Sequence, residues 1–250
     1  MNLLPGLRDL RAPLAAGYLW LAGLWLSLTH ASWTHASWLP SKRPPGNGEV
    51  ARLWDLGGAL GKTLVLAAVT FIAYLIGSFL EITPDGRVAE YLAPIVLFDR
   101  PDMAHSLSPQ VRSDMVKLLE QRHPITSQTN DRSAADKIIE EIMHEMSQLA
   151  TQLLVKNKEL YSKHDKHMAE AAVRINVSIP LTLLLILATW FSGIPIWLRS
   201  VLTIIISVFG FMLLRQGFTR RVWAQDVIVQ ALIFDEIQSS KIPPEKPPEE

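Results

Sequence analysis

Two glutamate–histidine pairs, Glu120/His123 and Glu141/His144, have the three-residue spacing that places both side chains on one face of a helix. Four-helix proteins that bind two iron or manganese ions use two such pairs together with two further inward-facing glutamates. Here the glutamates beside Glu141 project in other directions, and His123 precedes a proline at a helix end. Glutamate is common in helices, so chance accounts for the spacing. The sequence therefore assigns no metal ligand to these pairs.

The segment KHDKH holds His164 and His167 three positions apart, between Lys163 and Lys166. The two imidazoles share a helical face, so a metal site is one interpretation. The segment stands within about ten residues of a long apolar block. A basic collar that touches anionic lipid headgroups is therefore the favoured interpretation, and a solvated helix face is the third.

Residues 29–38 read THASWTHASW, a five-residue unit that occurs twice in succession. Five residues rotate a helix by about 500°, so His30 and His35 point roughly 140° apart. On a strand they fall on opposite faces. The favoured interpretation is a tandem duplication at a membrane interface, where tryptophan is enriched. A proton- or metal-sensitive histidine pair is the alternative.

The segment GGALGKT ends like a phosphate-binding loop, but the glycine required five positions before its last glycine is Leu56. No strand precedes it, and an apolar helix follows. The small-residue spacings Gly57/Gly61 and Ala73/Gly77 are instead typical of close packing between membrane helices.

Four apolar blocks dominate the chain and lie at 12–29, 63–80, 175–191 and 194–214. A bilayer core of about 30 Å requires roughly 20 apolar residues in a helix, and all four blocks reach or approach that length. The sequence therefore predicts an all-α, four-pass helical membrane protein with a helical cytoplasmic domain. A cleavable signal peptide is the alternative interpretation of the first block, although its apolar run exceeds the usual 7–15 residues.

Basic residues are more frequent beside the termini and the central region, which places those parts in the cytoplasm of the cell. The expected organisation has five parts. These are a membrane helix pair in 1–82 (helices 12–30 and 58–81, external loop 31–57), a cytoplasmic helical domain at 83–174, a membrane hairpin at 175–216, a cytoplasmic amphipathic helix at 217–238 and a disordered tail at 239–250.

Capping signals predict the cytoplasmic helices. Ser108-Pro109 should open a helix that runs to about Arg122. Ser133 should open one helix of about 42 residues, roughly 60 Å long, that continues into the third membrane helix. Its apolar stripe is expected to pack against a stripe in the 217–238 helix. The first stripe comprises Ile142, Met146, Leu149, Leu153, Leu160 and Met168, and the second comprises Val222, Val229, Ile233 and Ile237. The apolar segment 88–98 is expected along the inner membrane surface.

The composition narrows the functional classes. Lys and Arg balance Asp and Glu at 24 each, so net charge does not indicate nucleic acid, and the absence of cysteine excludes thiolate chemistry. We expect a structural, scaffolding or regulatory protein that acts through helix–helix contacts. A subunit of an oligomeric ion channel is the alternative, and a metal-dependent membrane enzyme is the third. The expected partners are the lipid bilayer, further copies of the chain through its membrane helices, and a protein at the cytoplasmic helices. No catalytic residue or cofactor is assigned.

Overall fold

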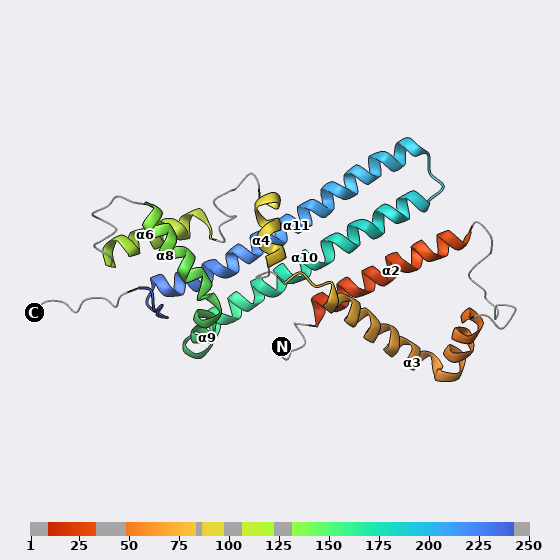
Figure 1. Ribbon diagram of the computed structural model, residues 1–250, viewed down its shortest axis with the longest axis horizontal. Coiled ribbons are helices and arrows are strands. Elements are labelled where there is room, and N and C mark those ends of the chain that lie inside the picture. Colours follow the sequence, from red (N-terminus) through yellow and green to blue (C-terminus); the bar gives the residue numbers. More distant parts are fainter. Residues whose placement is uncertain (1–9, 34–48, 84–86, 98–106, 123–131, 243–250) are drawn as a thin grey trace, which may run out of the picture. The chain divides into compact units, whose positions relative to one another are not determined.

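The computed structural model describes residues 10–33, 49–83, 87–97, 107–122 and 132–242. These residues form eight α-helices and no strand (Figure 1). The helices are α2 (Arg11–Trp33), α3 (Glu49–Phe79), α4 (Arg87–Val96), α6 (Pro109–Arg122), α8 (Arg132–His144), α9 (Met146–Lys156), α10 (Lys158–Phe191) and α11 (Ile196–Ile233). The predicted all-α fold is confirmed. The chain divides into two compact units, 1–83 with 172–214 and 84–171 with 215–250.

Two of the described helices, α10 and α11, are long and apolar enough to cross a membrane, where the sequence predicted four. In α3 the apolar part, Thr63–Phe79, is shorter than that length requires. This helix also begins at Glu49. Residues 49–57, which were predicted to belong to an external loop, are therefore helical.

Helices α2 and α3 of the first unit cross with their backbones in direct contact. A Cβ atom added to Gly17 would lie 1.7 Å from the carbonyl oxygen of Ala73, and one added to Gly77 would lie 1.8 Å from that of Pro13. Only glycine leaves room for such an approach, so the predicted Ala73/Gly77 packing motif is confirmed. The side chain of Tyr18 also hydrogen-bonds that of Thr70 across the pair. The side chains around Gly57 and Gly61 lie outside the described residues.

Helices α10 and α11 form the predicted hairpin around residues 192–195 (Figure 1). Trp190 Nε1 donates to Thr203 Oγ1 at 3.2 Å, and a Cβ added to Gly210 would lie 1.9 Å from Thr182 Oγ1. Arg199 Nε donates to the carbonyl oxygen of Ile194 at 2.7 Å. This contact gives the guanidinium a partner in the turn.

In the second unit, the predicted bounds of α6 are confirmed, because the helix begins at Pro109 and ends at Arg122. The backbone N–H of Ser108 donates to Asp226 Oδ1 on α11 at 3.0 Å. This bond attaches the first turn of α6 to α11. Burial raises the pKa of the Asp226 carboxyl above its ordinary value.

The predicted single helix from Ser133 into the third apolar block is wrong, because three helices occupy that region. Breaks occur at Glu145 (φ −87°, ψ 0°) and at Asn157 (φ −140°, ψ 89°). Asn157 Oδ1 accepts the backbone N–H of Leu160 at 3.2 Å, so Asn157 caps the start of α10. Only α10, from Lys158, continues into that block.

The breaks allow the short helices to share one core with α6 and α11. The core comprises Leu107, Val111, Met115, Leu118, Leu119, Ala135, Ile139, Ile142, Leu149, Leu153, Ile228, Val229, Ala231, Leu232, Ile237 and Ile242, all nearly fully buried. Five stripe residues belong to it: Ile142, Leu149, Leu153, Val229 and Ile237. The predicted packing of the two stripes is therefore confirmed for these residues.

The C-terminal segment differs from the prediction. Helix α11 ends at Ile233. Asp235 then adopts a positive φ of 58°, and the Glu236 N–H bonds the Ala231 carbonyl at 2.9 Å, as in a Schellman cap. Residues 239–242 of the tail expected to be disordered are ordered, because Ile242 is buried in the core.

Polar contacts hold this segment in place. The hydroxyl of Ser239 donates to Glu145 at 2.8 Å, and Lys241 pairs with Glu141 at 3.1 Å. The hydroxyl of Ser240 also donates to Glu145, and this bond is the largest cause of the lowered pKa of that carboxyl. The composition of SSKIPPEKPPEE is typical of a solvated segment. Composition alone therefore could not predict these contacts.

Candidate functional site

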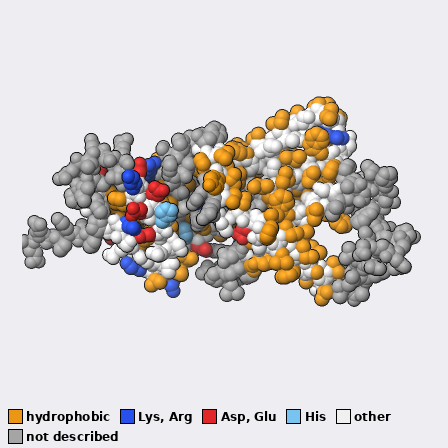
Figure 2. Space-filling view, in the orientation of Figure 1, with side chains coloured by type: hydrophobic (Ala, Val, Ile, Leu, Met, Phe, Trp, Pro, Cys, Tyr) orange, Lys and Arg blue, Asp and Glu red, His pale blue; other side chains and the backbone are white. Residues whose placement is uncertain are grey.

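A cavity of about 1000 Å³ lies in the second unit, among helices α6, α8, α9, α10 and α11. Helices α8, α9, α10 and α11 contribute residues at helical spacing, and α6 contributes Arg112. The α11 wall is Arg221, Gln225 and Ile228, at steps of four and three, and the α10 wall includes Tyr161 and His164. Charged and histidine side chains gather on the surface of this unit in Figure 2.

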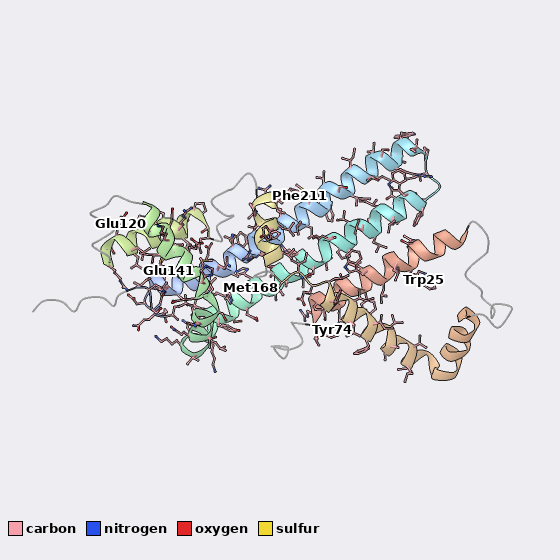
Figure 3. The ribbon with its side chains drawn as sticks, viewed as in Figure 1. Trp25, Tyr74, Glu120, Glu141, Met168 and Phe211 are labelled. Carbon is pink, nitrogen blue, oxygen red and sulfur yellow. The ribbon has the colours of Figure 1, made fainter. Side chains whose placement is uncertain are left out.

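The walls of the cavity that come from α8 and α9 carry both apolar and polar side chains. Met143 and Met146 line them, and Met168 adds a third methionine from α10 (labelled in Figure 3). Methionine is flexible and polarisable, so such walls adapt to irregular apolar shapes. At one edge, Arg112 Nη2 and Asp136 Oδ1 form an ion pair at 2.8 Å.

Two polar residues of α11 are buried at this wall. Arg221 and Gln225 are each only 6% exposed. The Gln225 Oε1 atom is enclosed and has no hydrogen-bond partner. Leaving a buried polar atom unpaired costs about 1–3 kcal/mol. The cavity wall therefore retains polar groups at an energetic cost, and an apolar core would avoid that cost.

His164 stands at the cavity with its tautomer defined by a backbone contact. Its Nδ1 lies 2.9 Å from the carbonyl oxygen of Ala224 on α11. Because a carbonyl only accepts, Nδ1 carries the proton. In the neutral ring Nε2 is then the acceptor. This contact also links α10 to α11 beside the cavity.

His167 takes part in a different cluster from His164. Arg220 Nη1 lies 3.4 Å from His167 Nδ1, and Arg220 Nε lies 3.3 Å from Glu170 Oε2. The Arg220 guanidinium also stacks 4.7 Å above the ring of Trp223. Burial, and next the positive charge of Arg220, lower the pKa of His167.

The predicted metal interpretations gain no support from this geometry. His164 and His167 contact different partners, and Glu141 pairs with Lys241. His144 is exposed and lines the cavity. Within the described ranges, no three His, Asp or Glu side chains come together in a way that could hold a metal ion.

The remaining predicted positions fall elsewhere. Glu120 is exposed on α6, and its partner His123 lies outside the described residues. The side chain of His30 and all of His35 also lie outside them, so the repeat stays a prediction. Lys62 lies inside α3, thirteen positions after its start at Glu49, where no phosphate-binding loop can form.

Sequence reasoning missed the cavity and its polar wall. The available signal was the pair Arg221 and Gln225, four residues apart and next to the apolar stripe position Val222. Polar residues so close to a buried stripe indicate a wall that is not purely core. The arrangement is suited to binding an amphipathic molecule. No protein-family model matches this sequence, and no curated protein or solved structure matches it either.

Proposed function

We propose that this protein is a helical membrane protein, inserted through α10 and α11, that acts as a scaffold or regulatory subunit through helix–helix contacts. One observation carries the proposal. Helices α10 and α11 both line the cavity in the second unit, and both run without interruption into the long apolar stretches. Because each helix is continuous from the cavity to its apolar stretch, a change in packing at the cavity would act on the start of that stretch.

The exposed surface of the apolar stretches supports their insertion into lipid. Ile196, Trp197, Ile204, Phe209 and Met212 of α11 are all more than half exposed. Large apolar side chains exposed in such numbers require an apolar environment. In Figure 2 hydrophobic side chains dominate the surface of the first unit, which contains these stretches.

The transmission can be tested by filling the cavity from α9, which carries no membrane stretch. Ser147 is exposed and lines the cavity, whereas its neighbour Gln148 is exposed and does not line it. Spin labels on Leu185→Cys and Phe209→Cys report the distance between α10 and α11 in nanodiscs. Ser147→Trp should shift that distance distribution, and Gln148→Trp should leave it unchanged. Equal distributions in both folded variants would contradict the proposal.

The number of membrane crossings, two or the four expected from the sequence, can be tested separately, because the chain has no cysteine of its own. Single cysteines replace Ser37, Lys137 and Gly193, and an impermeant thiol reagent is added outside intact cells. Four passes predict labelling at Ser37 and Gly193 and protection at Lys137. Protection at Ser37 together with labelling at Gly193 would mean that only α10 and α11 cross.

The alternative is a subunit of an oligomeric ion channel, since a pore can be lined by uncharged helices from several copies. The mass of the purified protein in detergent and ion flux in liposomes distinguish the two functions. A ring of subunits with flux would establish the channel. A monomer without flux would leave the scaffold or regulatory role.

A further inference from the structure

Helix α4 is apolar on two opposite sides. Ala89, Ala93 and Val96 are at most 5% exposed and pack against the protein. On the other side, Val88 and Tyr91 are 56% and 78% exposed. Ile95 follows at the next helical step and is 65% exposed. Among the described side chains of α4, the outward face is thus a stripe of three large uncharged groups, which is unfavourable in water.

The chain itself holds the start of α4 close to the beginning of a membrane stretch. The Ile82 N–H donates to Asn176 Oδ1 at 2.6 Å, and Asn176 Nδ2 donates to the Ile82 carbonyl at 3.1 Å. Asn176 belongs to α10 and lies beside Ile175, where the third apolar block begins. Arg87 follows Ile82 by five residues, which span at most about 18 Å.

Together these observations indicate that lipid covers the exposed face of α4. At that distance from the apolar block, the polar headgroup region of a bilayer is within reach of α4, since it adds several ångströms to each side of the hydrocarbon core. Tyrosine is enriched at this depth, because its ring is apolar and its hydroxyl reaches water. We infer that α4 is an interfacial helix that embeds Val88, Tyr91 and Ile95 in the inner leaflet of the bilayer.

This inference rests on the proposed membrane function and deepens it. An interfacial helix would fix the depth of the second unit against the membrane through contacts that α10 and α11 do not provide. The occupant is a lipid surface, bound through apolar burial of about 5–10 Å into the headgroup boundary. A protein partner or a second copy of the chain would instead exclude lipid from the same stripe.

Spin-label accessibility in nanodiscs of the full-length chain tests the inference. Labels on Val88→Cys, Tyr91→Cys or Ile95→Cys occupy exposed positions and leave the packed side of α4 intact. Two further labels serve as references. Phe211→Cys lies in the apolar stretch of α11 and reports lipid, and Lys137→Cys lies exposed on α8 and reports water.

The expected result is a several-fold higher ratio of oxygen to nickel-chelate accessibility at the three α4 sites than at Lys137. If Phe211 reports lipid and Tyr91 reports water, the inference on α4 is wrong while the membrane function stands. If the α4 labels are shielded from both reagents, a protein covers the stripe and the lipid occupant is wrong. If Phe211 itself reports water, the proposed membrane function fails, and the inference fails with it.

Discussion

The crossing of α2 and α3 predicts a sharp response to a single methyl group. Gly77→Ala places a Cβ atom 1.8 Å from the carbonyl oxygen of Pro13, whereas ordinary contact begins at 3.4 Å. The helix backbones must therefore separate by about 1.6 Å at this point. No flexible side chain can move to relieve the clash, because the neighbouring atom belongs to the backbone.

The magnitude follows from two opposing effects. Overpacking of a tight contact costs about 1–3 kcal/mol. Replacing glycine with alanine inside a helix restores up to about 1 kcal/mol of helix propensity. With the full propensity gain subtracted, the net expectation is a loss of up to about 2 kcal/mol for packing of α2 against α3. Gly23 is the matched control, because a Cβ atom added there meets nothing within 4 Å. Gly23→Ala should therefore leave the pair unchanged or slightly stabilise it.

The assay uses energy transfer between dyes on Leu24→Cys and Leu66→Cys. Both positions are exposed, and both extend the antiparallel pairing seen between Tyr18 and Thr70. Titration with denaturing detergent should separate the dyes at a lower concentration in Gly77→Ala than in the parent. Coinciding curves for Gly77→Ala and Gly23→Ala would refute the close crossing and the reasoning that assigns it to glycine.

The helical domain permits three further measurements by thermal unfolding. Leu153→Ala removes a fully buried side chain and should cost about 2–5 kcal/mol, while Val155→Ala, at a position 77% exposed, should change stability by less than about 0.5 kcal/mol. Equal losses would mean that Leu153 is not in the core. Asn157→Ala removes the cap of α10 and should cost roughly 0.5–2 kcal/mol, an effect that a continuous helix would not show. Hydrogen bonding from Ser240 lowers the pKa of Glu145 below its ordinary 4.5, so its stabilising contribution is present above that pH and is lost as the pH falls through the lower folded-state value. Glu145→Gln should remove this part of the acid sensitivity, and an unchanged pH profile would contradict the contact.

Local signals in the sequence were sufficient where neighbouring residues determine the structure. Ser108 and Pro109 define the start of α6, and the proline after His123 leaves no room for the helix to continue far beyond Arg122. The Ala73/Gly77 spacing indicated a close helix contact for the same reason. The spacing could not predict which residue Ala73 contacts, since its partner Gly17 lies more than fifty residues away in the sequence.

The prediction of one long helix failed at Asn157, because this residue fits two sequence patterns. Asn157 fits the spacing of the apolar stripe, and its side chain also makes it a good helix cap. Periodicity favoured a continuous helix, but the cap and the shared core determined the outcome. Ile237 shows the converse case, because it was predicted on a helical stripe and is buried after the helix has ended.

The apolar stripe did not predict the two helix breaks, and these breaks make the cavity possible. A straight helix from Ser133 would present only one face to α11. Because the chain turns at Glu145 and again at Asn157, α8, α9 and α10 each present a separate face around one space. Gln225 lines that space, and its enclosed Oε1 atom has no hydrogen-bond partner. Helix α10 begins at Lys158, lines the cavity in its first turns and carries Pro180 within its apolar part.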